Sequence, residues 1–131
     1  STNIEPSLRV VADQIRLEQL LCNILANALD ALEGVEQKSI SIGASREGGQ
    51  GARACIAISN SGPPIAPDVL QRMFEPFVTT KPAGKGLGLG LMLSNHIARS
   101  FGGELHARNL APRGAEFIVL LPLADKAGSF A

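Results

Sequence analysis

The chain has 131 residues, of which 45% are hydrophobic and 18% are charged, and its 12 basic and 12 acidic side chains cancel. This length and balance predict one folded domain over residues 1–131 and argue against disorder. The zero net charge argues against a broad basic surface for nucleic acid. No apolar run approaches the ~20 residues that span a bilayer. Because Ser1 stands where an initiator methionine is expected, we take the chain as a fragment of a longer protein.

The first half of the chain predicts a strand, a helix and a hairpin. Residues 8–11 form a short β-branched run that is typical of a strand. Asp13 then occupies an N-cap position, and Gly34 suits the end of the helix that follows. The apolar stripe of that helix consists of Ile15, Leu17, Leu21, Ile24, Leu25, Ala28 and Leu32. Alternating residues at 39–45 and 53–59, separated by glycines, predict a β-hairpin.

The next part of the chain predicts two helices separated by a long loop. The Gly-Pro-Pro sequence at 62–64 interrupts regular secondary structure, and a short helix can begin at Pro67 and extend to about Phe74. Residues 79–90 are rich in glycine and lack a periodic apolar signal, so we expect a mobile loop there. A second amphipathic helix then follows at about 89–101.

Two alternating runs, 104–108 and 116–121, complete the predicted elements. The order of elements predicts an α/β fold, specifically a two-layer sandwich whose mixed five-stranded sheet is covered by helices on one face. Cys22 and Cys55 show no metal-binding or disulfide spacing, and we expect both to be buried small hydrophobic residues in a reducing compartment.

The first helix carries a polar stripe with two interpretations. Asn23, Asn27 and Asp30 recur at i, i+4 and i+7, so they share one face of the helix. They could form an ordinary solvated face, which is the default for an amphipathic helix. Asparagine can also contribute an oxygen to a Mg²⁺ shell and N–H donors to phosphate. The spacing alone leaves both interpretations open.

A glycine tract precedes the second helix. Glycine alternates with other residues from Gly84 to Gly90, and free N–H groups at a helix start favour negative charge. The pattern matches neither a P-loop nor GxGxxG, so a phosphate cradle and a flexible linker both remain open. Upstream, Phe74 and Phe77 flank a proline, which fits a hydrophobic anchor for a lid or a turn at the core edge.

Together these segments resemble the ATP-binding catalytic domain of two-component sensor histidine kinases. The matching boxes, in order, are Asn23–Ala31, Phe74–Lys81 and Gly84–Leu91, and the closing strands are Phe101–Leu105 and Gly114–Pro122. The resemblance covers residues 8–122 and leaves 123–131 as a tail. The sequence of the lid segment most resembles those of nitrogen-regulation and C4-dicarboxylate-transport sensor kinases.

The resemblance implies a Bergerat-type ATP-binding fold, shared with DNA gyrase, that uses ATP and Mg²⁺. It implies that Asn27 helps to hold Mg²⁺ and that Asn23 contacts the phosphates. The full set of implied nucleotide-binding positions is Asn23, Asn27, Asp30, Asn60, Gly62, Ile65, Phe74, Thr79, Thr80, Lys81, Lys85, Gly86, Leu87, Gly88 and Gly90.

The implied activity is transfer of the γ-phosphate to a histidine on a dimerisation domain outside this chain. Relatives that hydrolyse ATP carry a glutamate where Asn23 stands, and an amide cannot act as a general base. His96 and His106 lack the context of a phosphoacceptor, so we expect them to be ordinary surface or core-edge residues. The expected partners are that domain and, indirectly, a response regulator. We expect a cytoplasmic, monomeric fragment of a homodimeric parent that is itself membrane-anchored or free.

One box departs from the family pattern. The usual Asp-Asn-Gly-x-Gly is replaced by residues 60–64, Asn-Ser-Gly-Pro-Pro. In the family this aspartate accepts a hydrogen bond from the adenine amino group, and Asn60 could still accept through its carbonyl. Loss of the charge would cost about 1 kcal/mol, or roughly fivefold in affinity. The departure therefore leaves a second hypothesis, a degenerate docking module that binds nucleotide weakly or not at all.

Overall fold

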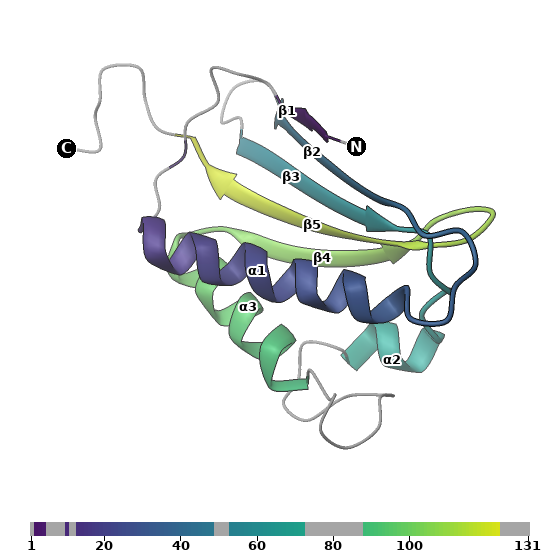
Figure 1. The fold of residues 1–131 in the computed structure, drawn as a ribbon. Helices are drawn as coiled ribbons and strands as arrows, with labels where there is room; N and C mark the ends of the chain where they lie inside the picture. The colour runs from purple at the N-terminus through teal and green to yellow at the C-terminus, as the bar shows by residue number, and fades with distance from the viewer. Residues whose placement is uncertain (1, 5–9, 11–12, 49–52, 73–87, 124–131) are drawn as a thin grey trace.

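The computed structural model describes residues 2–4, 10, 13–48, 53–72 and 88–123. Its described elements form two layers, a five-stranded sheet and a layer of helices that covers one face of that sheet (Figure 1). The predicted two-layer sandwich with helices on one face is therefore confirmed.

The sheet is mixed, as predicted, and its first described strand was not among the predicted ones. In spatial order it contains β1 (Thr2–Ile4), β2 (Ile40–Glu47), β3 (Arg53–Asn60), β5 (Ala115–Pro122) and β4 (Glu104–Asn109). β1 runs parallel to β2, and the other neighbours are antiparallel. The strand predicted at 8–11 lies largely outside the described residues and stays a prediction. Only Val10 of that range is described, and it makes a single bridge with Leu123.

Three helices are described: α1 (Gln14–Ala31), α2 (Pro67–Arg72) and α3 (Gly88–Ser100). The Asp13 side chain accepts a hydrogen bond from the Ile15 amide at 3.3 Å, which confirms the predicted N-cap. Gly34 has a φ of 81°, in the left-handed region that favours glycine. The predicted end of α2 at Phe74 lies outside the described residues. Among the described helices, none has the length and apolarity needed to cross a membrane.

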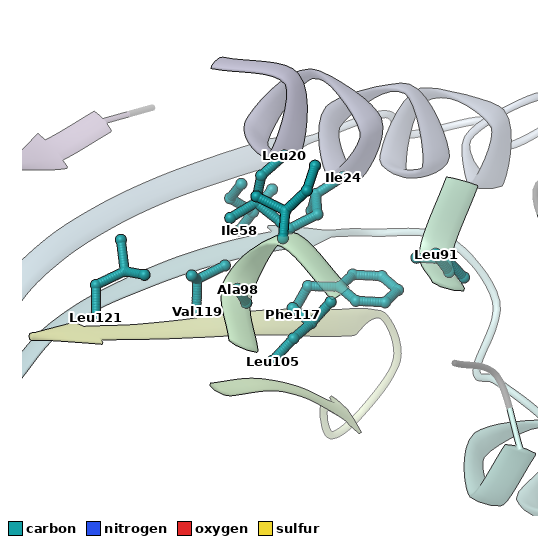
Figure 2. Packing of buried hydrophobic residues seen from close by; sticks show 10 residues of the cluster. Leu20, Ile24, Ile58, Leu91, Ala98, Leu105, Phe117, Val119 and Leu121 are labelled. Carbon is teal, nitrogen blue, oxygen red and sulfur yellow. The ribbon is translucent and has the colours of Figure 1, made fainter. Parts of the chain in front are cut away.

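A single core fills the space between the helices and the sheet (Figure 2). Its buried members are Leu20, Ile24, Ile58, Leu91, Ile97, Ala98, Leu105, Phe117, Val119 and Leu121. Alternate residues of β3 and β5 point into it, as strand geometry requires. At the N-terminal end of α1, the Arg16 guanidinium lies 5.7 Å from the centre of the Phe101 ring.

The buried face of α1 is rotated slightly from the predicted one. Leu20, Ile24 and Ala28 are fully buried, whereas Ile15 is 76% exposed. Leu20, Ile24 and Ala28 are four residues apart, so they lie on the same face of the helix, and this face packs against the core. Ile15, in the first turn, points away from this face. The apolar spacing correctly predicted a helix, but the buried stripe does not extend to Ile15 at its N-terminal end.

The outer face of the sheet carries charged side chains that pair with one another. Arg53 and His106 both contact Glu104, at 2.6 and 2.8 Å, and Arg108 contacts Glu116 at 2.7 Å. The short bonds from Arg53 and His106 hold the pKa of the Glu104 carboxyl below its usual value. Because the helices cover only the opposite face, these ion pairs face solvent.

The two cysteines are free, and the expectation that both are buried is wrong for Cys22. Cys22 lies on the exposed side of α1, whereas Cys55 is half-buried in β3. Burial, with a hydrogen bond to Glu47, raises the pKa of the Cys55 thiol to about 11. This thiol is therefore protonated at neutral pH, and the thiolate that carries cysteine reactivity is scarce.

Candidate functional site

The polar stripe on the first helix, which we call the amide stripe, lies in the C-terminal half of α1. Its members Asn23, Asn27 and Asp30 are all half-buried, beside the fully buried Ile24 and Ala28. A purely solvating face would be more exposed than this. The amide stripe therefore borders the core, where its polar atoms can be shielded by whatever lies against α1.

The residues predicted to form the lid are only partly described. Phe74, Thr79, Thr80, Lys81, Lys85, Gly86 and Leu87 lie outside the described residues. Gly88 and Gly90 lie in the first turn of α3, which begins one residue before the predicted start. In Figure 1, α2 and the first turn of α3 lie below the C-terminal half of α1. The segment that carries the missing contacts thus connects two elements at this end of the helical layer.

The β3–α2 loop, residues 61–66, packs against the end of α1. A Cβ atom on Gly62 would lie 2.7 Å from the backbone oxygen of Ala31 and 2.9 Å from Asn60 Oδ1. Such distances leave no room for a side chain, so glycine is required by this close approach. Ala31 directly follows Asp30, so this contact brings Asn60 and Gly62 to the C-terminal end of the amide stripe.

Asn60 is the last residue of β3 and is only 5% exposed. Its Oδ1 accepts a hydrogen bond from the Gly62 amide at 2.8 Å. On the other side, a Cβ atom on Gly114, whose φ is 109°, would clash with the Asn60 backbone oxygen. Asn60 is therefore confined by Gly62 and Gly114, and the carbonyl that we expected to meet adenine already has a partner.

Ser61 fastens the β3–α2 loop to the segment that enters β2. Its hydroxyl accepts from the Ser39 amide and donates to the Gln37 carbonyl, each at 2.8 Å. The Ser61 amide also donates to the Ser39 carbonyl at 3.0 Å. This residue, one of the departures from the family box, thus has a clear structural role.

Asn109 holds the other end of the same loop, and sequence reasoning missed it. Its Oδ1 accepts from the Ile65 amide and its Nδ2 donates to the Ile65 carbonyl, both at 2.8 Å. Asn109 pairs with Ala115 in β5, which pairs with Asn60 in β3. Because these three residues share one row of the sheet, Asn109 reaches the loop that follows Asn60. An amide at the last position of a strand was the available signal.

Two cavities in the described residues lie away from the amide stripe. An apolar one of about 260 Å³ is lined by side chains of α1, β2 and β3 together with Val10. A more polar one of about 800 Å³ is lined by residues 33–37, Ser61, Pro63, Pro112 and Arg113. Neither is lined by Asn23 or Asn27, so we assign neither to the candidate site.

The described residues fit a metal that arrives with its own oxygen ligands. They contain no cluster of three or more histidine, cysteine, aspartate or glutamate side chains that could hold an ion. Mg²⁺ usually keeps several waters and takes only one or two protein oxygens beside substrate phosphates. The Asn27 amide, with the Asp30 carboxylate one turn later, offers such a limited set.

Comparison with known proteins places this chain in a family. Residues 12–125 match the family described as histidine kinase-, DNA gyrase B-, and HSP90-like ATPase. The chain is 44% identical over 131 aligned positions to the two-component sensor PprA of Pseudomonas aeruginosa, covering 93% of this chain and 14% of PprA. It is 38% identical to the C4-dicarboxylate transport sensor protein DctB of Rhizobium meliloti, covering 89% of this chain and 18% of DctB.

A solved structure has a similar fold. The crystal structure of full-length ShkA in complex with AMPPNP matches 94% of this chain and 26% of its own, with a TM-score of 0.71 and 30% identity. The chain therefore spans only a minor part of these relatives.

Proposed function

The chain belongs to the histidine kinase-, DNA gyrase B- and HSP90-like ATPase family, and we propose that it binds Mg·ATP for phosphoryl transfer to a histidine on another domain. The observation that carries this proposal is the contact between Gly62 and Ala31, which brings the β3–α2 loop to the end of the amide stripe. One triphosphate nucleotide could then meet Asn60 at its base and the amide stripe at its phosphates.

The amide stripe would contact the phosphate end of the nucleotide. In this proposal the Asn27 oxygen binds Mg²⁺ and the Asp30 carboxylate lies near the same ion. The Asn23 N–H groups donate to phosphate oxygens. Mg²⁺ would neutralise phosphate charge. Backbone N–H groups in the first turn of α3, at Gly88 and Gly90, favour an anion because they lack helical partners. The lid contacts at 74–87 remain predictions.

The chemistry of these groups favours transfer over hydrolysis. An amide at Asn23 cannot take a proton from water, so α1 provides no general base at this position. Phosphoryl transfer depends mainly on positioning and charge neutralisation, which amides and backbone N–H groups can supply. The acceptor histidine would come from elsewhere. His106 contacts Glu104 on the outer sheet face, and His96 is an exposed residue of α3.

We further propose how the domain is used. Residues 1–131 would form one catalytic domain with its core at about 8–122, joined in the parent to a dimerisation domain that carries the phosphoacceptor. A homodimeric parent would then pass the phosphoryl group to a response regulator. Relatives named as two-component and transport sensors support this setting. A cytoplasmic location would give the domain access to ATP.

A calorimetric titration tests the proposal. The chain should bind ATP in the presence of Mg²⁺, and Asn27→Asp or removal of Mg²⁺ should weaken binding. The matched control is Gln19→Glu, which makes the same amide-to-acid change at an exposed position of α1. Equal affinity with and without Mg²⁺ would contradict the metal role. No binding of any nucleoside triphosphate would favour the docking-module alternative.

A further inference from the structure

The orientation of the Asn60 side chain is fixed by its surroundings. Its Oδ1 accepts from the Gly62 amide at 2.8 Å, so reversing the amide would place two donors against each other. The residue is 5% exposed, and an unpaired polar group at such a depth is costly. Gly62 is also packed closely against α1, since a Cβ atom on it would lie 2.7 Å from the Ala31 oxygen. The oxygen of Asn60 therefore faces the loop, and the nitrogen is the end it can offer to a ligand.

This orientation inverts the polarity of the contact. An aspartate in the same geometry would give one oxygen to Gly62 and present the second oxygen as an acceptor. Asn60 gives its only oxygen to Gly62 and presents Nδ2, which can only donate. The difference from the family box is thus more than the loss of one charge. A partner that donates at this point would meet a second donor and leave both unpaired.

We propose that Asn60 makes this site prefer nucleotides with a 6-oxopurine base, hypoxanthine or guanine, over adenine. The inference rests on the proposed function, in which the base lies against Asn60, and on the resemblance, in which the residue at this position contacts the 6-amino group of adenine. A 6-oxo group accepts the Nδ2 hydrogen bond, whereas the 6-amino group of adenine donates. Sites built around one hydrogen-bonding pattern discriminate strongly against the opposite pattern, because buried polar groups are then left unpaired. The triphosphate and metal contacts on α1 are unchanged.

Competitive titration with ATP and ITP tests the inference, because these two nucleotides differ only at the 6-position and at the adjacent N1, which carries a hydrogen in hypoxanthine. With Mg²⁺ present, the wild-type chain should bind ITP about tenfold more tightly than ATP. Asn60→Asp should reverse this order by restoring an acceptor. Gln19→Glu, which changes an exposed amide to an acid, should leave the ratio as in the wild type. GTP should follow ITP unless its 2-amino group meets an obstacle, so ITP is the primary probe.

The outcomes separate this inference from the proposed function. Wild-type chain that binds ATP more tightly than ITP overturns the base preference and leaves the kinase domain proposal standing. Failure of both wild type and Asn60→Asp to bind any of the three nucleotides overturns both. Because the wild-type ratio needs no variant, the result does not depend on whether Asn60→Asp folds. Circular dichroism melting curves establish that separately.

Discussion

The two parts of the candidate site are held in different ways. The amide stripe belongs to one helix, so the backbone of α1 aligns its three members on one face. The β3–α2 loop is held by residues from other elements, with Asn109 at Ile65, Ser39 and Gln37 at Ser61, and Ala31 against Gly62. Its partners lie up to 44 positions away in the chain. Alignment in the first is local, and in the second it depends on the whole fold.

This difference predicts how each part tolerates change. A substitution at Asn23 in the amide stripe should remove a ligand contact while the helix remains, because the backbone hydrogen bonds of a helix do not depend on this side chain. A substitution in the supports of the β3–α2 loop should lower stability and ligand affinity together. The predictions below test this separation, in order of decreasing effect on the free energy of unfolding.

Gly62→Ala should have the largest effect. The added Cβ would lie 2.7 Å from the Ala31 oxygen, so either the loop or the end of α1 must shift. Overpacking of this kind costs about 1–3 kcal/mol, and Asn60 should lose its bond to the loop as well. We expect a lower melting temperature and at least a tenfold loss of nucleotide affinity, a factor worth about 1.4 kcal/mol.

Gly34→Ala is the matched control for this change. A Cβ atom added to Gly34 would have no neighbour within 4 Å, but the φ of 81° makes alanine strained there. It should lower stability by about 1 kcal/mol without changing nucleotide affinity. If Gly62→Ala lowers stability without lowering affinity, the loop is not part of the site.

Asn109→Ala should come second. It removes both hydrogen bonds to Ile65 and leaves the amide and carbonyl of that residue to find water. Because this contact is exposed, we expect the free energy of unfolding, measured by chemical denaturation, to fall by about 1–2 kcal/mol. Nucleotide affinity should fall several-fold. Asn109→Asp keeps the acceptor for the Ile65 amide and should lose about half as much. Unchanged affinity in Asn109→Ala would show that the loop keeps its position without this clamp.

Asn23→Ala tests the opposite behaviour in the amide stripe. Alanine is the best helix former, so the helix should keep its stability or gain a few tenths of a kcal/mol, about 0.5 at most. Loss of a hydrogen bond to a charged phosphate should weaken nucleotide binding by about tenfold. Calorimetry and thermal melting measure the two effects separately. A clear loss of stability would mean that Asn23 serves the fold instead of a ligand.

The same difference explains what could be read from the sequence. The α1 stripe, its N-cap at Asp13 and the hairpin were predictable because local spacing determines them. The clamp by Asn109 was not, since it depends on a row of the sheet that joins β3, β5 and β4. Nor was the direction of the Asn60 amide, which is set by the Gly62 amide. The strand Thr2–Ile4 was missed because three residues are too few for an alternating pattern to show.

The smallest effect should come from the outer face of the sheet, away from both parts of the site. Hydrogen bonds from Arg53 and then His106 lower the pKa of Glu104 below its ordinary value of 4.5. A lowered pKa means that the unfolded chain binds this proton more readily than the folded one. The contribution to stability is therefore present above about pH 4.5 and is lost as the pH falls through the lowered pKa.

Denaturation midpoints measured across this acid range should show a shallower pH dependence for Glu104→Gln than for the wild type. Arg53→Gln removes the largest cause of the shift, so it should flatten the curve in the same way, and the two changes should not add. The effect should be slight because solvent and salt screen an exposed pair. Nucleotide affinity should stay at the wild-type value in both variants. A change in affinity would mean that the outer face and the β3–α2 loop are coupled through β5, and that the separation between local and fold-wide support fails there.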